Sequence, residues 1–181
     1  MFRALALVIL TASAATVASS QPDSRTTTYK GPVHLPSTCR GQDLSVRHVT
    51  EDRAMGGQNS IDYALKNVSS NACTLKGYPR FELLSKAGKP LPRGRAINSE
   101  QLPGDEGKMR PQLVTILPGQ EAWFRVHYNS GGAGYVGKPC PVSRKVRIVA
   151  PGTTRAFVLK ENITSCRTVE VSAVRGSPLP D

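Results

Sequence analysis

The chain has 181 residues and a net charge of +11, and aromatic residues make up only 6% of it. This length suits one domain with a sizeable core. The basic residues are scattered without a run of five like charges, and no nucleic-acid-binding motif is present, which argues against a specific nucleic-acid partner. With 16 Gly, 14 Pro and no sustained helical periodicity, the chain is expected to form short strands and many turns.

The first 20 residues have the pattern of a secretory signal peptide. Arg3 precedes an uncharged, mostly apolar stretch over residues 4–17, and small residues suited to cleavage follow. The apolar stretch is shorter than the roughly 20 residues that a transmembrane helix needs. We therefore assign residues 1–20 to a signal peptide, with no transmembrane segment after its cleavage, and residues 21–38 to a flexible N-terminal arm.

Four cysteines follow the arm: Cys39, Cys73, Cys140 and Cys166. An even number of cysteines behind a signal peptide predicts two disulfides formed in an oxidising compartment. Three pairings are possible, and the sequential one, 39 with 73 and 140 with 166, is the simplest and is preferred. No cysteine lies in a CxxC motif, so neither a redox motif nor a zinc site is indicated.

Alternating apolar and polar residues mark the strands. The clearest example is Ile61, Tyr63 and Leu65, which alternate with polar or small residues. Further strands are expected near residues 43–50, 73–75, 81–83, 113–117, 122–128, 146–148, 156–160 and 169–173. About eight or nine strands with no helix predict an all-β fold, an antiparallel immunoglobulin-like β-sandwich.

The sandwich is predicted to be a single domain over residues 39–175, followed by a C-terminal tail over residues 176–181. Its core is expected to come from the apolar sides of the strands, one layer from each sheet. The predicted core residues are Tyr63, Leu65, Phe81, Leu83, Phe124, Val126 and Ile148.

Two segments are expected to be irregular. Residues 51–60 form a connecting turn around two glycines, and residues 90–112 form the longest loop, with four prolines and several glycines. A loop of that length in a compact domain is often functional. Its basic residues make it a candidate anion-binding loop: Arg93, Arg95, Lys108 and Arg110.

Catalytic and metal-binding patterns are weak. The three histidines, His34, His48 and His127, are far apart and lack a recognised ligand spacing. There is no GxSxG motif, and no cysteine is free if both disulfides form. We therefore assign no catalytic residue, no metal and no cofactor, and expect a protein that is not an enzyme.

Several motifs resemble a known family. These are Cys39, the run CTLKGYP at residues 73–79, the LPG turn at residues 117–119, Cys140 and Cys166. Together they resemble the bacterial secreted domain of unknown function 4232 family, over about residues 39–174. The resemblance implies an extracytoplasmic β-sandwich, often tethered to the membrane, although no lipid-anchored cysteine follows the signal peptide here. Within the motif, Gly77, Tyr78 and Pro79 are expected on physical grounds to form a kink between strands, with the Tyr78 ring buried and its hydroxyl bonded to the backbone.

These observations favour an exported protein, periplasmic or extracellular, that acts as a binding or interaction module of the bacterial cell envelope. The scattered basic residues are first of all expected to keep the surface soluble. A dedicated anion site is the alternative, and the partner would then be an envelope polyanion or another envelope protein. A structural or stress-related envelope protein without a ligand is a second hypothesis. An unrecognised hydrolase is a third.

Overall fold

The computed structural model describes residues 36–53, 55–103, 107–131 and 136–178. They belong to one compact unit, Leu35–Asp181. The predicted signal peptide and residues 21–35 of the predicted arm lie outside the described residues. Within the described part no helix is long and apolar enough to cross a membrane.

The described residues form strands, two short 3₁₀ turns and no α-helix. The 3₁₀ turns are Gly41–Asp43 and Met55–Gly57. The strands are β1 (Leu44–Arg53), β2 (Gln58–Asn67), β3 (Cys73–Leu75), β4 (Arg80–Leu84), β5 (Pro90–Arg95), β6 (Ile97–Asn98), β7 (Val114–Ile116), β8 (Glu121–Asn129), β9 (Lys145–Val149), β10 (Ala156–Leu159) and β11 (Glu170–Val171).

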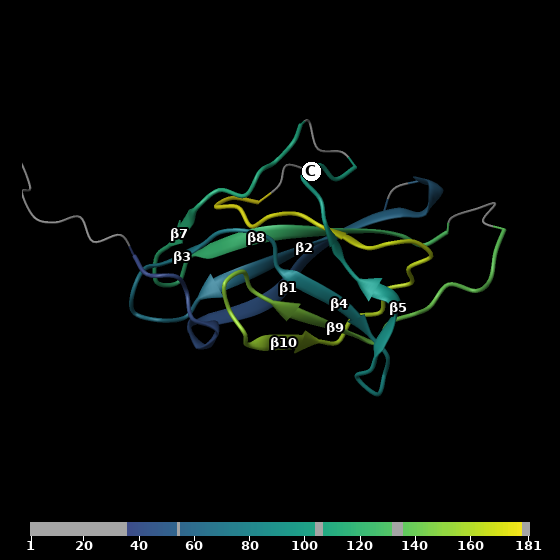
Figure 1. Cartoon of the computed structure of the whole chain (residues 1–181), viewed down its shortest axis with the longest axis horizontal. Helices are drawn as coiled ribbons and strands as arrows, with labels where there is room; N and C mark the ends of the chain where they lie inside the picture. Colours follow the sequence, from purple (N-terminus) through teal and green to yellow (C-terminus); the bar gives the residue numbers. More distant parts are fainter. Residues whose placement is uncertain (1–35, 54, 104–106, 132–135, 179–181) are drawn as a thin grey trace, which may run out of the picture. The chain divides into compact units, whose positions relative to one another are not determined.

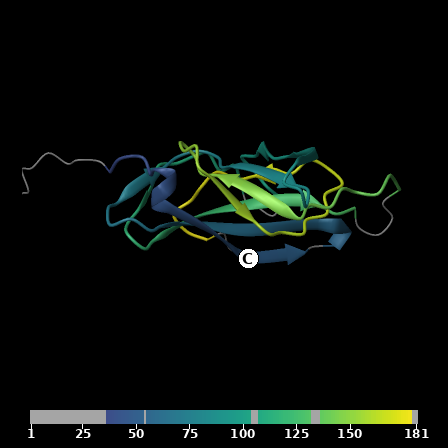
Figure 2. The ribbon, with the colours of Figure 1, turned by 90° about the horizontal axis from the view of Figure 1, so that it is seen from below.

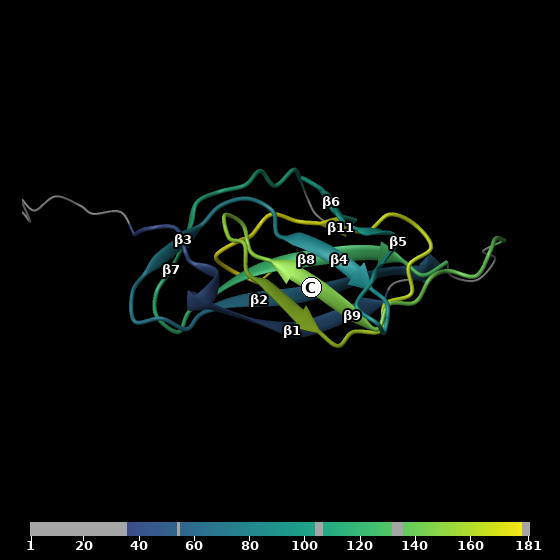
Figure 3. The same cartoon turned by 60° about the horizontal axis from the view of Figure 1, so that its bottom comes forward.

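Two larger sheets form the β-sandwich, and a third, small sheet lies at one end (Figure 1). The five-stranded sheet has the order β1-β2-β8-β11-β6, and the four-stranded sheet has the order β10-β9-β4-β5. All pairs in both sheets are antiparallel except β11 with β6. Figures 2 and 3 show the four-stranded sheet lying across the long strands β1, β2 and β8. The predicted fold class is confirmed.

The core lies between the two larger sheets. The seven residues predicted for it are all buried, with at most 1% of their surface exposed. Tyr63 of β2 joins the layers, because its ring lies 5.6 Å from that of Phe81 on β4 and 5.3 Å from that of Phe124 on β8, between centroids. Burial of three aromatic side chains in contact is a large apolar contribution to stability.

The Tyr63 hydroxyl makes no hydrogen bond within the described residues. Burial, together with the nearby Glu161 carboxylate, raises the pKa of this phenol far above its ordinary value. The side chain is therefore neutral, and its ring serves the core.

Two predictions about irregular segments are wrong. Residues 90–112 are not one loop, because the chain forms β5 and β6 within residues 90–98, and these add to the predicted strand count. Pro90 is the first residue of β5 and pairs with Leu84, and Pro92 lies in a bulge over residues 91–94, before the pairing resumes at Arg95 with Glu82. The turn at residues 51–60 is also shorter than predicted, because β1 extends to Arg53 and β2 begins at Gln58.

The disulfides pair Cys39 with Cys73 and Cys140 with Cys166, which confirms the preferred pairing. The first bond is buried and ties the chain before β1 to β3. The second joins the segment before β9 to the segment before β11, beside a backbone hydrogen bond from Cys166 N–H to the Asn129 carbonyl. The first bond therefore closes a segment that contains β1 and β2, and the second closes a segment that contains β9 and β10.

Candidate functional site

The outer face of the four-stranded sheet is basic. On β4, Phe81 and Leu83 point into the core, so Arg80 and Glu82 point outward. On β9, Val146 and Ile148 point inward, so Lys145 and Arg147 point outward. In the register of the sheet Glu82 lies opposite Arg147 on one side and opposite Arg95 of β5 on the other.

A depression of about 460 Å³ opens on this face. Three arginines and one carboxylate contribute its charged groups. The lining residues are Arg80, Phe81, Glu82, Arg95, Arg147, Val149, Thr154 and Ala156. They come from β4, β5, β9, β10 and the turn between β9 and β10.

One ion pair crosses the depression. The Arg147 guanidinium donates through Nη1 to Glu82 Oε2 at 2.8 Å, with 41% of the arginine side chain and 24% of the glutamate side chain exposed. Arg80 and Arg95 are exposed and have no ion pair within the described part of the chain. Three guanidinium groups against one carboxylate leave two positive charges in excess, so the site is suited to an anion.

Arg95 is placed by the β5 bulge. Arg93 has a φ of 57°, a left-handed conformation that is unusual for a non-glycine residue. Gly94 follows it and is buried, and an added Cβ there would lie 2.9 Å from the Leu83 carbonyl oxygen. The close approach of Gly94 to β4 lets the chain re-enter the ladder at Arg95, opposite Glu82.

The four predicted anion-binding residues are split into two places. Arg93 and Arg95 lie on β5, with Arg95 in the depression. Lys108 and Arg110 line a second groove of about 310 Å³, beside the segment from Ala173 to Ser177 that follows β11. The two cavities share no lining residue, so the structure does not bring the four residues into one site.

The two described histidines have structural partners, and His34 lies outside the described residues. His48 on β1 pairs through Nδ1 with Glu161 Oε1 at 2.9 Å. His127 on β8 is buried, with Nε2 2.8 Å from Gln58 Oε1 and Nδ1 3.3 Å from Ser60 Oγ. Burial lowers the pKa of His127, and Glu170 opposes this shift. The histidines therefore do not form a shared site.

The Gly77-Tyr78-Pro79 motif connects β3 to β4. Gly77 has a φ of 116°, which a glycine adopts without strain, and its carbonyl accepts from Val174 N–H. Pro79 is buried, but Tyr78 is only half-buried. The expected burial of the Tyr78 ring is therefore wrong in degree, because the kink leaves part of this residue facing solvent.

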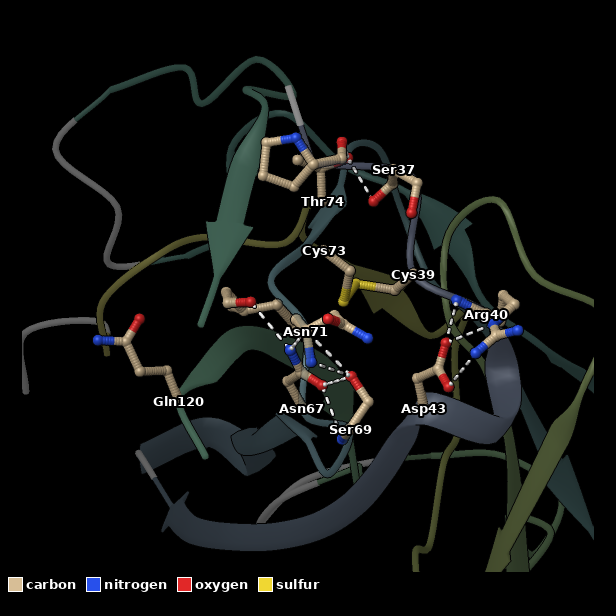
Figure 4. Close-up of a disulfide and its surroundings, with 12 residues drawn as sticks. Ser37, Cys39, Arg40, Asp43, Asn67, Ser69, Asn71, Cys73, Thr74 and Gln120 are labelled. Atoms are coloured by element: carbon tan, nitrogen blue, oxygen red, sulfur yellow. Dashed lines mark hydrogen bonds and ion pairs between the residues drawn. A yellow bond between two sulfur atoms is a disulfide. The ribbon is translucent and has the colours of Figure 1, made fainter. Parts of the chain in front are cut away.

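The buried disulfide has a polar neighbour. Figure 4 shows that Asn67, at the end of β2, forms hydrogen bonds with residues of the segment that leads to Cys73. Its fully buried side chain donates to the carbonyls of Asn71 and Ile116 and accepts from the Ser69 amide and hydroxyl. The Arg40–Asp43 ion pair on the other side of the disulfide is exposed. The contacts around this disulfide therefore stabilise this end of the domain.

The sequence prediction missed Arg80, Glu82, Arg147 and Thr154 as site residues. The available signal was alternation, because each arginine is next to a buried residue of its strand and so points outward. Alternation does not show which strands are neighbours. The pairing of β4 with both β5 and β9 is what gathers these side chains.

The fold and site together define a disulfide-linked all-β domain with a basic depression on one face. The family model for the domain of unknown function DUF4232 matches residues 39–178, so the chain belongs to that family. No curated protein matches the chain.

Proposed function

We propose that this protein is an exported, non-enzymatic binding domain of the bacterial cell envelope. In this proposal the outer face of its four-stranded sheet binds an anionic partner in the envelope. The observation that carries the proposal is the group of three arginines, Arg80, Arg95 and Arg147, around a depression with a single carboxylate. Guanidinium groups remain charged at any physiological pH and match the geometry of carboxylate and phosphate groups.

Export is supported by two observations. The two disulfides are typical of proteins from oxidising compartments. The N-terminal sequence has the pattern of a signal peptide. An envelope polyanion would meet the domain there, and the net charge of +11 for the whole chain would favour the encounter.

The test is a binding series of the mature protein with heparin, single-stranded DNA and anionic vesicles at about 50 to 200 mM salt. Changing Arg80, Arg95 and Arg147 to serine is expected to abolish most binding at the lowest salt concentration. The slope of log affinity against log salt is expected to become shallower by about two to three, because each arginine that is replaced no longer releases a counterion from the polyanion.

The matched control changes Lys108 and Arg110 to serine, because these basic residues line the separate groove. This variant is expected to keep most of the affinity. A loss of binding in the control instead of the arginine variant would move the site to the groove. A wild-type protein that does not bind at the lowest salt concentration would contradict the proposal and favour a structural envelope protein without a ligand.

A further inference from the structure

Glu82 has an unusual place for a carboxylate in a basic depression. It lies between Arg95 and Arg147 in the register of the sheet. Its Oε2 accepts from Arg147, and its Oε1 has no hydrogen bond within the described residues. With 24% of the side chain exposed, this second oxygen is the only strong negative acceptor that the described lining offers to a ligand.

A carboxylate only accepts hydrogen bonds, so Glu82 discriminates between two kinds of anion. An anion without hydrogen-bond donors is attracted by the arginine side chains but repelled by the Glu82 carboxylate. An anion that carries hydroxyl groups beside its charge is attracted by the same arginines, and its hydroxyl groups can also donate hydrogen bonds to Glu82. Thr154 is exposed in the same lining, and its hydroxyl, which both donates and accepts, adds a second polar contact of this kind.

The remaining lining residues, Phe81, Val149 and Ala156, are apolar. Val149 and Ala156 lie opposite each other on β9 and β10 and form part of the depression. Val158 lies opposite Arg147 in the same pair of strands and is 55% exposed. Val149 is buried, whereas Ala156 and Val158 are exposed and offer apolar surface next to the charges. Such a surface suits the C–H face of a sugar ring. The cavity volume is within the range of about 300–1,000 Å³ found for small-molecule sites.

From these features we propose that the depression binds an acidic saccharide. In this arrangement Arg80, Arg95 and Arg147 bind the anionic groups, and Glu82 and Thr154 bind neighbouring hydroxyl groups. Glu82 is the residue that determines specificity. The inference rests on the proposed function and deepens it, because it names the chemical class of the anionic partner.

The test compares two probes with the disulfide-intact mature protein at about 50 mM salt. Oligogalacturonate carries carboxylates and hydroxyls, and polyacrylate with the same number of carboxylates carries no hydroxyls. Glu82→Gln is expected to weaken oligogalacturonate binding about tenfold, because it removes a hydrogen bond to a charged acceptor. The same change is expected to strengthen polyacrylate binding about threefold, because a repulsive charge is removed.

Two further variants serve as controls. Glu121→Gln makes the same charge change on the opposite sheet, where Glu121 pairs with Arg47, and is expected to leave the ratio of the two affinities unchanged. Thr154→Val is expected to weaken only the oligogalacturonate, about threefold. Thermal melting of each variant shows that it is folded before its affinity is compared.

The outcomes separate the inference from the proposed function. Opposite shifts for the two probes in Glu82→Gln support the inference. Shifts in the same direction, whether equal or not, or wild-type binding to polyacrylate without binding to oligogalacturonate, overturn it and leave the anion-binding proposal standing. A folded wild-type protein that binds neither probe nor the heparin of the first test contradicts both.

Discussion

The outer faces of the two sheets use the same residue types in opposite ways. On the five-stranded sheet two outward arginines each have their own carboxylate partner in a two-point interaction. Arg47 binds Glu121 at 2.9 and 2.8 Å, and Arg125 binds Asp62 at 2.7 and 2.9 Å. On the four-stranded sheet three arginines line a depression with one carboxylate, Glu82, and of the three only Arg147 forms an ion pair with it.

The first face also has a largely buried ion pair, Arg125 with Asp62, although its other pair, Arg47 with Glu121, is 50% and 19% exposed. The Arg125 and Asp62 side chains are only 14% and 9% exposed, whereas those of Arg147 and Glu82 are 41% and 24% exposed. A buried pair must satisfy its own charges, because water is excluded. An exposed group with excess charge keeps bonding capacity for a partner. The paired charges of the first face serve the fold, and in the function proposed above the excess charge of the second face serves binding.

The largest expected change in stability comes from substitutions in the core, which the inward faces of the two sheets form together. Phe124→Ala on β8 and Phe81→Ala on β4 should each lower the free energy of unfolding by about 3–5 kcal/mol, because each leaves a cavity beside Tyr63. Urea denaturation measures both. An unchanged stability for either variant would mean that its ring is not in the common core.

The next effect tests the difference between the outward faces. Asp62→Ala should lower the free energy of unfolding by about 2–3 kcal/mol, because it removes two hydrogen bonds from a largely buried guanidinium. Glu82→Ala should cost less than about 1 kcal/mol, because its pair is partly exposed. Equal reductions of stability in urea denaturation would remove the distinction between a structural face and a binding face.

The inward and outward faces also differ in how far the sequence reveals them. The core was predictable, because Tyr63, Phe81 and Phe124 each sit in a period-two pattern that needs no knowledge of partners. The presence of two disulfides was predictable from four cysteines behind a signal-peptide pattern, whereas the sequential pairing was only the preferred one of three. The basic depression was not predictable from the sequence. Arg80, Arg95 and Arg147 come together only because β4 pairs with both β5 and β9.

The β5 strand was missed for a local reason. Its prolines and glycine are typical of a loop, and a period-two pattern does not include them. The ladder tolerates them because the chain bulges over residues 91–94 and Gly94 packs against Leu83. Such a bulge depends on a contact with another strand, which the sequence of the segment itself does not contain.

The bulge supplies a third prediction, at the margin of the binding face. Gly94→Ala should lower the free energy of unfolding by about 1–3 kcal/mol, because the new methyl group would meet the Leu83 backbone and side chain. Arg93→Asn should raise it by about 0.5–1 kcal/mol, because asparagine tolerates the left-handed conformation better than arginine. Denaturation curves of the two variants should therefore shift in opposite directions, and shifts of the same sign would contradict this account of the bulge.

The smallest expected effect is a pH dependence of stability that arises on one face and not on the other. The four-stranded face carries arginines, which do not titrate, whereas the five-stranded face buries His127. Burial holds the pKa of His127 below its ordinary value of 6.5, so the unfolded chain binds the proton first as pH falls. Stability should then be full above about pH 6.5 and decline as pH falls from there through the lower pKa of the folded state.

His127→Gln removes this titration and keeps a neutral polar group beside Gln58 and Ser60. The stability of the variant should therefore decline less than that of the wild type between about pH 7 and pH 5, whatever its value at neutral pH. Melting temperatures across that range measure the difference between the two slopes. Glu170, which lies opposite His127 on β11, opposes the pKa shift, so Glu170→Gln should make the decline steeper in a protein that retains His127. If His127→Gln and the wild type decline in parallel, the acid sensitivity comes from other groups, and the two faces do not differ in their response to pH.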